Sequence, residues 1–591
     1  MAQETATGIA SVFGHLVGSD EKILEQCLSL CQTYNLGAED LKFKWEASNF
    51  KSSSTRSEIS PFTLDSLLAL REQMRCDVTR DSAKKPQKRM VTTTNTAMVN
   101  RSRIPANMLK NVNPAISSVG NAQVKSEPGY GLAGPSTGRS AVVFKGPAMD
   151  ALSRKTRSYR YMYEKISERS EALDDRIDEF GELIREHYNI SELGDPSSST
   201  DEEITVIGRI THDSESSAAS AKLTETSLAL ESSRMHASGA RVPLRFDPGL
   251  LIRGGAQGSG GTGIFPGAIV ALKGKNGGGG WFLVTEILSL PPLKPSPAAL
   301  GLTGTKSDPG SIDTPFSMFI VSGPYTQDTD LSYKPWKRLV ETIKAAKPTV
   351  VLLIGPFIDV QHPILKTGEV DATPASLFRS RFIDPLRMFL DSSPGSIALI
   401  VPSVRDLISR QAVFPQGELG AELTNADPRI HLLPNPVRFS INDISFAVSS
   451  VDAVYHLRKE EFMKRGREID SIPPSSTDDT GTDSMANTCR CLLEQRSFYP
   501  LFPVPLDVSH EVNLSVTHLD HLKLGDEKDN CAPDILIVPS RLKQFNKVVH
   551  STMATNPSFL IKGTYATLNV TPRGTLSLRE RLTMNIVKLE S

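Results

Sequence analysis

The sequence predicts a multidomain protein with an all-α bundle at the N-terminus, then a β-barrel, then an α/β domain. Three observations predict this order. Amphipathic helical patterns occupy the first 78 residues, five short strands with glycine-rich turns lie between residues 202 and 290, and strands alternate with helices from residue 313 onward. A chain of 591 residues is also too long for one hydrophobic core. The expected parts are residues 1–78 as a helical docking domain, 79–150 as a disordered linker, 151–300 as a long helix with the barrel, and 301–591 as the α/β domain.

The bulk composition excludes several classes of protein. A formal net charge of −1 argues against a protein that holds DNA by bulk electrostatics. The six cysteines are scattered, which indicates a reducing compartment rather than a disulfide framework. The N-terminus lacks the pattern of a signal peptide, and no run reaches the roughly 18 apolar residues that span a bilayer. We therefore expect a soluble intracellular protein without a membrane partner.

Two helices account for the N-terminal pattern. Ser19 can cap the first, which has apolar residues at three- and four-residue steps and a stop signal at Gly37. The second begins near Thr63 and is expected to bury an apolar set of Leu64, Leu67 and Leu68. So few apolar residues suit a small bundle, which is more often a docking module than an enzyme.

The composition changes between Thr79 and Pro147. Asn, Ser, Thr, Gly and Pro dominate there without periodicity, which is typical of a disordered tether. The tether contains one basic cluster, Lys84 to Arg89. This cluster is compatible with a nuclear import signal, although solvated basic runs are common in linkers.

A long helix is predicted next, from about Ser153 to Tyr188. Its apolar residues fall on one stripe at three- and four-residue steps: Tyr159, Tyr163, Ile166, Leu173, Ile177, Phe180, Ile184 and Tyr188. Arg169 and Ser170 interrupt this stripe, so packing on the next domain of the same chain is favoured over a coiled coil.

The β-rich region that follows suits a small Greek-key barrel of the OB type. Its expected strands are Glu203–Ile210, Ser227–Glu231, Arg241–Phe246, Ala268–Lys273 and Trp281–Leu288. OB barrels often bind single strands through aromatic side chains and basic grooves. Phe246, Trp281 and Phe282 are candidates for stacking, but few Lys or Arg accompany them, so protein docking is favoured over nucleic-acid binding.

The α/β domain is organised around Val350–Ile354, a uniformly apolar run typical of a parallel strand that is buried on both faces. The other expected strands are Phe316–Val321, Ile397–Val401, Ile444–Val448, Asp534–Val538, Ala566–Val570 and Met584–Leu589. Residues 466–487 are rich in Ser, Thr, Asp and Gly and are predicted to form a mobile surface insertion. Open α/β sheets place their chemistry at the carboxyl ends of the strands, so that edge is the candidate site.

The strand ends indicate a two-metal phosphoesterase fold whose ligands have been replaced. Such enzymes hold two cations with carboxylates and imidazoles, in patterns such as D-x-H, G-D-x-x-D, G-N-H-[DE] and G-H-x-H. Here the corresponding segments read SGP, GPFID, VPSVRD and IVPSRL. We therefore expect an inactive two-metal phosphoesterase fold with no catalytic residue, metal or other cofactor. The predicted vestigial positions are Ser322, Pro324, Pro356, Asp359, Ser403, Asp406 and Ser540.

Asp359 and Asp406 are the acidic residues that remain at these positions. Isolated carboxylates in loops are more often caps or ion-pair partners than metal ligands. Other segments resemble ligand or phosphate sites only weakly, because none has the complete pattern. They are His518-Leu519-Asp520-His521, Cys489-Arg490-Cys491, the glycine-rich Gly254–Gly263 and Gly304–Ser307.

Six motifs in the C-terminal half carry a family resemblance. They are GPFID at Gly355, VPSVRD at Val401, LLPNPV at Leu432, FAVSSVDAVYHL at Phe446, QRSFYPLFP at Gln495 and PDILIVPSRL at Pro533. In these motifs and their order the chain resembles the B subunits of the eukaryotic replicative DNA polymerases. The resemblance implies an OB barrel packed on an inactivated calcineurin-like phosphoesterase domain. The archaeal relative is an active exonuclease, and this chain departs from its ligand pattern at every cluster.

The resemblance also implies a function. Such a subunit would be a non-catalytic scaffold in the nucleus that grips the C-terminal zinc-binding domain of the catalytic polymerase subunit. It would hold the polymerase beside primase for primer synthesis, dock replisome peptides on its N-terminal bundle, and contact DNA weakly or indirectly. The N-terminal module on its tether, the helix end Leu183–Ile190 and the overall length favour the branch of the family that works with primase.

Three other hypotheses remain open from the sequence. The chain could be a B subunit of another replicative polymerase. It could be a metal-dependent phosphodiesterase or nuclease that uses His518, Asp520 and His521. The barrel could also bind single-stranded nucleic acid independently, with an affinity that falls as salt rises.

Overall fold

The computed structural model describes most of the chain from residue 141 onward and parts of the first 71 residues. The described residues are 12–13, 21–34, 37–39, 41–45, 64, 66–68, 70–71, 141–148, 150–157, 159, 161–212, 222–302, 314–475, 481–525, 530–572 and 576–589. The chain divides into two compact units, Met1–Pro128 and Gly129–Ser591. No helix among these residues is long and apolar enough to cross a membrane.

The described part of the first unit is helical, as predicted. Helix α2 spans Glu21–Tyr34 and buries Cys27, Leu30 and Cys31 at helical spacing. These side chains share a small core with Phe13, Ile23, Leu41, Trp45, Leu67 and Leu70. Leu68 is exposed, which corrects its predicted burial. The predicted cap Ser19 lies outside the described residues.

The predicted linker is too long at its C-terminal end. Residues 141–148 are ordered, and Phe144–Lys145 forms strand β1, which pairs antiparallel with β12 (Val437–Ile441). The Val143 N–H donates to Asn442 Oδ1 at 3.0 Å, and Val142 is buried in the core beneath. A two-residue strand carries too short a pattern to be read from sequence. Residues 79–140 lie outside the described part of the chain.

The predicted long helix is two helices, α5 (Ala151–Arg157) and α6 (Ile166–Tyr188). Between them the backbone bends at Met162, where φ is +65°, and Tyr159 is buried against the rings of His518 and His521. The prediction that the stripe packs on its own chain is confirmed, because Ile177, Phe180 and Ile184 share a core with the barrel strands. Tyr163 and Ile166 are exposed and do not belong to that buried stripe.

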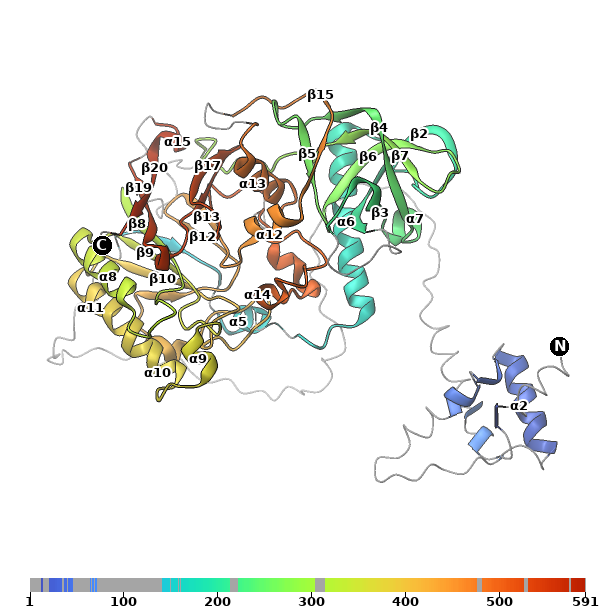
Figure 1. Ribbon diagram of the computed structural model, residues 1–591, viewed down its shortest axis with the longest axis horizontal. Helices are drawn as coiled ribbons and strands as arrows, with labels where there is room; N and C mark the ends of the chain where they lie inside the picture. The colour runs from blue at the N-terminus through green and yellow to red at the C-terminus, as the bar shows by residue number, and fades with distance from the viewer. Residues whose placement is uncertain are drawn as a thin grey trace, which may run out of the picture. The chain divides into compact units, whose positions relative to one another are not determined.

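The β-rich region forms a closed barrel of five strands, with α6 packed on it (Figure 1). The barrel closes because β4 pairs with β3 on one side and with β7 on the other. All five predicted strands are confirmed, and β5 is additional. The elements are β2 (Thr200–His212), η3 (Glu225–Ser227), β3 (Leu228–Glu231), α7 (Arg234–Ala237), β4 (Arg241–Arg253), β5 (Gly261–Ile264), β6 (Ile269–Asn276) and β7 (Phe282–Leu288).

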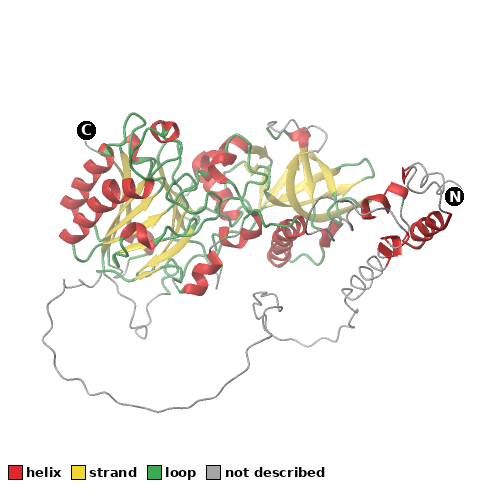
Figure 2. Ribbon diagram, turned by 90° about the horizontal axis from the view of Figure 1, so that it is seen from below, coloured by secondary structure: helices red, strands yellow, loops and turns green. Residues whose placement is uncertain are grey.

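The C-terminal region contains two six-stranded sheets. Figures 1 and 2 show this region from two sides. One sheet has the order β11-β10-β9-β8-β19-β20 and the other β1-β12-β13-β16-β18-β17. The seven predicted strands are confirmed with small shifts in their ends. The strands not yet named are β8 (Phe316–Ser322), β9 (Val350–Ile354), β10 (Ile397–Val401), β11 (Ile430–Leu432), β13 (Ile444–Val448), β16 (Ile535–Ile537), β17 (Phe545–Val549), β18 (Thr552–Asn556), β19 (Thr564–Val570) and β20 (Leu582–Lys588).

Apolar side chains of the two sheets meet in one core, which includes Ile320, Leu352, Phe446 and Ile537. The opposite face of the first sheet is covered by helices, whose apolar side chains form a second core with alternate residues of the same strands. These helices are α8 (Lys334–Ala346), α9 (Pro363–Thr367), α10 (Pro374–Phe378), the π-helical turn η4 (Arg379–Ile383), α11 (Asp384–Ser392), η5 (Ala421–Thr424) and η7 (Leu560–Lys562). Four other helices contribute to a core with the barrel: α12 (Ala453–Glu460), α13 (Ser484–Glu494), α14 (Ser509–Val512) and η6 (Val516–Leu522). Helix α15 (Leu578–Arg581) contributes to the core between the two sheets.

The segment predicted as a mobile insertion joins the α/β region to the barrel. Strand β14 (Phe462–Arg465) pairs with β5, and β15 (Arg467–Ile469) adds to the barrel strand β4. Asp483 then caps α13 by accepting from the backbone N–H of Ala486 at 2.9 Å. The predicted mobile insertion was wrong for the described residues 466–475 and 481–487. The polar residues of this segment form a strand at the edge of the barrel sheet and the N-terminal cap of a helix.

The barrel and the α/β region therefore share a core. One hydrophobic cluster contains barrel residues such as Phe282 together with Cys489 and Leu492 of α13. The Gln495 amide binds both backbone groups of Ile269, with its Oε1 3.0 Å from the N–H and its Nε2 2.8 Å from the carbonyl. The Phe502 N–H donates to the Pro266 carbonyl at 3.0 Å. These contacts fix the barrel to the α/β region along the QRSFYPLFP segment.

We predict that Gly267→Ala weakens this junction. Gly267 has φ of +91°, and an added Cβ would meet the Phe502 backbone N–H and lie 2.7 Å from the Pro500 carbonyl oxygen. The expected loss is about 2–3 kcal/mol, from backbone strain and overpacking together. Thermal unfolding of the full chain measures it.

Gly280→Ala is the matched control. Gly280 also has positive φ, at +77°, but an added Cβ there meets nothing within 4 Å. It should therefore show only the backbone cost of about 1 kcal/mol. Equal losses of Tm in the two variants would contradict the prediction.

Candidate functional site at the strand ends

The parallel strands β8, β9 and β10 end at one edge of the first sheet and bring most of the predicted vestigial positions together. The Gly323 N–H donates to Ile354 O and the Gly355 N–H to Val401 O, both at 2.8 Å, so the loops that leave the strands stay in contact. A Cβ at Gly355 would meet the Asp406 carboxylate and lie 2.8 Å from the Ser403 nitrogen, so the chain itself fills this edge. The side chains of Pro324 and Pro356 offer no polar atom to a ligand.

Asp406 holds this edge together. Its side chain is buried and accepts three backbone N–H groups, from Phe357, from Ile358 at 3.0 Å and from Ser403 at 2.8 Å. Burial raises the pKa of this carboxyl to about 7, although the three donors favour the charged form. Asp406 therefore joins the β9 loop to the β10 loop by hydrogen bonds to the backbone.

Asp359 is neutralised by a neighbouring cation. Arg405 binds it with two guanidinium nitrogens, and the Nε to Oδ1 distance is 3.1 Å. Backbone bonds flank the pair, from Val360 N to Arg405 O and from Leu407 N to Ile358 O, both 2.9 Å. As the sequence indicated, one remaining carboxylate is an ion-pair partner and the other accepts backbone N–H groups.

The serines at the predicted positions make local contacts. The Ser322 hydroxyl lies 3.4 Å from the Gly323 carbonyl oxygen, and Ser403 Oγ accepts from the Arg405 N–H at 3.2 Å. Ser540 follows β16 in the other sheet, where its N–H donates to Asn556 Oδ1 at 2.8 Å. The structure thus brings the β8, β9 and β10 positions together and places Ser540 on the second sheet.

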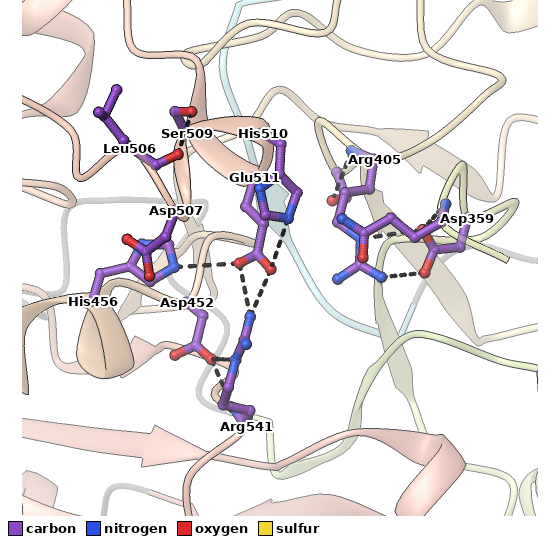
Figure 3. Close-up of polar contacts among 12 residues, drawn as sticks. Asp359, Arg405, Asp452, His456, Leu506, Asp507, Ser509, His510, Glu511 and Arg541 are labelled. Carbon is purple, nitrogen blue, oxygen red and sulfur yellow. Dashed lines mark hydrogen bonds and ion pairs between the residues drawn. The ribbon is translucent and has the colours of Figure 1, made fainter. Parts of the chain in front are cut away.

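A charged cluster beside this edge, in which Asp452 and His456 are buried and Arg541 is exposed, was missed by sequence reasoning (Figure 3). Glu511 accepts from Arg541 at 2.6 and 2.9 Å and lies 3.3 Å from His456 Nε2. The Arg541 backbone N–H also donates to Asp452 at 2.8 Å. Burial disfavours the charge on Glu511, but the bonds to His456 and Arg541 prevail and lower its pKa to about 2.

This cluster is structural in its geometry. His456 is fully buried, and its other ring nitrogen lies 3.2 Å from the Tyr499 hydroxyl, so both nitrogens have partners within the chain. Its members come from α12, α14 and the loop after β16, which are distant in sequence. Figure 3 shows the Asp359–Arg405 pair as a separate contact alongside. The signals in the sequence were the charged residues within the motifs at Phe446 and Pro533.

The other candidate ligands do not form a metal site. Within the part of the chain that the structure describes, no three His, Cys, Asp or Glu side chains are placed to hold a metal ion. His518 and His521 pack on the Tyr159 ring at 4.8 and 5.1 Å, and Asp520 pairs with Lys523 at 2.9 Å. The side chains of the CRC segment, Cys489 and Cys491, are buried on α13.

The glycine-rich segment Gly254–Gly263 binds a carboxylate of the chain itself. Glu468 accepts the backbone N–H of Gly258 at 3.0 Å and of Gly260 at 2.6 Å. Burial opposes the charge, yet these donors lower the pKa of Glu468. The loop is thus an anion cradle that β15 already fills. The segment Gly304–Ser307 lies outside the described residues.

The aromatic candidates on the barrel are covered. Phe282 is buried in the barrel core. The Arg245 guanidinium lies 3.7 Å from the Trp281 ring centroid, and Lys464 Nζ lies 4.5 Å from that of Phe246. Cations of the same chain therefore occupy the ring faces on which bases would stack.

Comparison with known proteins identifies the family. Residues 318–547 match the family model of the DNA polymerase alpha/epsilon B subunits, and residues 170–290 match that of the OB domain of the DNA polymerase alpha B subunit. The DNA polymerase alpha B subunit of Schizosaccharomyces pombe is 34% identical over 427 residues, which cover 71% of this chain and 69% of that protein. The chain belongs to the family of DNA polymerase alpha B subunits.

Two other members of the family are similar over most of the chain. The DNA polymerase alpha B subunit of Saccharomyces cerevisiae is 29% identical over 510 residues, 80% of this chain and 68% of that one. The DNA polymerase alpha B subunit of Bos taurus is 28% identical over 498 residues, which cover 79% of this chain and 72% of that protein. The predicted resemblance to accessory B subunits and the predicted OB barrel are confirmed.

Among solved structures, the crystal structure of a Thermus thermophilus protein aligns with 47% of this chain and with the whole of that protein, at 12% identity. Its TM-score of 0.21 supports no conclusion.

We predict that Arg405→Ala destabilises the protein by about 3 kcal/mol, because it leaves the buried Asp359 carboxylate without its cation. Arg410→Ala is the control. Its pair with Glu422 is exposed on both sides and should contribute less than about 1 kcal/mol. Thermal unfolding of both variants tests the difference, and equal Tm values would contradict it.

A second prediction concerns pH. The pKa of Asp406 is about 7 in the folded protein and has its ordinary value of 3.8 in the unfolded chain. The folded state therefore holds this proton more tightly, which stabilises it fully at low pH. The stabilisation is lost as the pH rises to about 7, where Asp406 ionises in the folded state too. The wild type should therefore lose stability relative to Asp406→Asn between pH 4 and pH 8, by on the order of 4 kcal/mol.

Urea unfolding of the full chain across this pH range measures the effect. The exposed Asp371→Asn variant should run parallel to the wild type. A difference between wild type and Asp406→Asn that stays constant with pH, or grows in favour of the wild type, would refute the titration.

Proposed function

We propose that this chain is a non-catalytic scaffold that binds the C-terminal domain of the catalytic subunit of DNA polymerase alpha. Through that subunit it would hold primase in the same complex and support primer synthesis in the nucleus. The observation that carries the proposal is the strand-end edge, where Asp406 is bonded to backbone and Asp359 to Arg405.

The chemistry of the edge supports the absence of catalysis. Two-metal hydrolysis needs several carboxylates or imidazoles that converge on an open face. We interpret the sandwich of two sheets as an inactive phosphoesterase-like domain in which Ser322, Pro324 and Pro356 have replaced ligands. The contacts of Asp359 and Asp406 then stabilise loops where an enzyme would hold cations.

A segment of the chain also lies over the loops that follow β10. Arg157 Nε is 3.3 Å from Glu418, the Tyr161 hydroxyl is 3.4 Å from Arg410 O, and Gln411 donates to Tyr159 O at 3.3 Å. These contacts of the described residues 150–157, 159 and 161 support a surface on which protein segments pack, and not one that admits a substrate.

The shared core of the barrel and the α/β region supports a scaffold role in another way. A partner that contacts both parts would bind a preformed surface and would not have to order two mobile domains. The N-terminal unit is compact on its own, which suits a separate module that docks replisome peptides.

Co-expression of the full chain with the C-terminal domain of the catalytic subunit tests the proposal. We expect a one-to-one complex by size-exclusion chromatography with light scattering. Failure of the wild-type chain to form the complex would overturn the scaffold function.

The competing enzyme hypothesis has its own test. With a phosphodiester substrate and manganese, we expect turnover at background level for the full chain. His510→Ala serves as the control because His510 is an exposed histidine outside the HLDH segment, whereas His518 is partly buried beside Tyr159. Turnover that is lost in His518→Ala but kept in His510→Ala would establish a hydrolase instead.

A further inference from the structure

A groove runs between α6 and η6. It has a volume of about 560 Å³. One wall is the N-terminal half of α6 with the residues just before it, and the other is the segment Thr517–Lys523. The lining is mostly charged, and none of its residues takes part in the contacts of Asp359 and Asp406 described above.

The α6 wall carries a stripe of like charge. Glu164, Glu168, Glu171, Asp175 and Glu179 follow one another at steps of three or four residues, and all line the groove. Like charges at this spacing destabilise a helix by a few tenths of a kcal/mol per pair. The stripe extends over about 22 Å, at 1.5 Å per residue.

Some of this charge is paired within the chain. Lys523 bridges Glu179 and Asp520 at 2.8 and 2.9 Å, and Glu164 accepts the Thr517 backbone N–H at 3.0 Å. Arg176 donates to the Gln495 carbonyl at 2.8 Å. Among the lining residues that the structure describes, six carboxylates, with Asp520 included, outnumber the two permanent cations.

An independent feature lies at the N-terminal end of the same wall. Met162, Tyr163 and Ile166 are 96%, 78% and 90% exposed, although all three are large and apolar. Tyr163 also lines the groove. A cluster of exposed apolar side chains beside a charged groove is typical of a protein-binding surface.

We infer that this groove binds a basic amphipathic helix of a partner protein, with Lys and Arg along the acidic stripe and apolar side chains against Met162, Tyr163 and Ile166. Nucleic acids and anionic lipid surfaces would be repelled by the same carboxylates. The length of the stripe matches about four helical turns. The inference does not depend on the scaffold function proposed above.

Fluorescence anisotropy with the full chain tests the inference. The probe is a labelled 16-residue peptide with leucine on one helical face and lysine on the other, and the control peptide has glutamate in place of lysine. The lysine peptide should bind, and more weakly as salt rises. The glutamate peptide should not bind.

Matched variants locate the binding surface. Glu171→Lys with Asp175→Lys should weaken binding of the lysine peptide about tenfold or more, whereas Glu341→Lys with Asp371→Lys, the same charge change at exposed positions of the α/β region, should not. Ile166→Ser should weaken it at constant charge, and the exposed Met388→Ser should not. The Tm of each variant verifies that it folds.

Two results would overturn the inference. One is that the groove variants and their controls lose equal affinity for the lysine peptide, which would mean that the net charge of the protein alone attracts the peptide. The other is a dimer of the wild-type chain that Ile166→Ser abolishes, which would mean that a second copy covers this face.

Discussion

The carboxylate of Asp406 is the contact on which the strand-end edge depends. It joins the loops after β9 and β10 through three backbone N–H groups, at the edge where α/β sheets usually carry their chemistry. Because both carboxylates of this edge are bound within the chain, neither is available to hold a cation without rearrangement. The loops at this edge are thus stabilised by two carboxylates of the kind that a two-metal hydrolase would use to bind its cations.

In the barrel, too, side chains of the chain itself occupy places where a ligand could bind. The glycine-rich loop that could bind an anion binds Glu468, and the aromatic faces that could stack on bases are covered by Arg245 and Lys464. Sites that would recognise small ligands are filled by the chain itself. The features that remain open are surfaces, such as the groove beside α6. This distribution is what one expects of a protein whose partners are other proteins.

Much of this architecture was predictable from local patterns. Val350–Ile354 is apolar at every position and could only be a strand buried on both faces, and the glycine-rich turns marked the barrel strands. The break before α6 was not predictable, because Tyr159 is held by His518 and His521, some 360 residues later in the chain. The Glu511 cluster was missed for the same reason, since its members meet only in the folded chain.

Strand β1 has a consequence for how the protein is made. It pairs with β12 about 300 residues later, so the ribosome must complete the whole barrel before that partner emerges. Until then the edge strand has no neighbour, and contacts this distant in sequence form slowly. This edge of the sheet is therefore completed only after about three quarters of the chain has been synthesised.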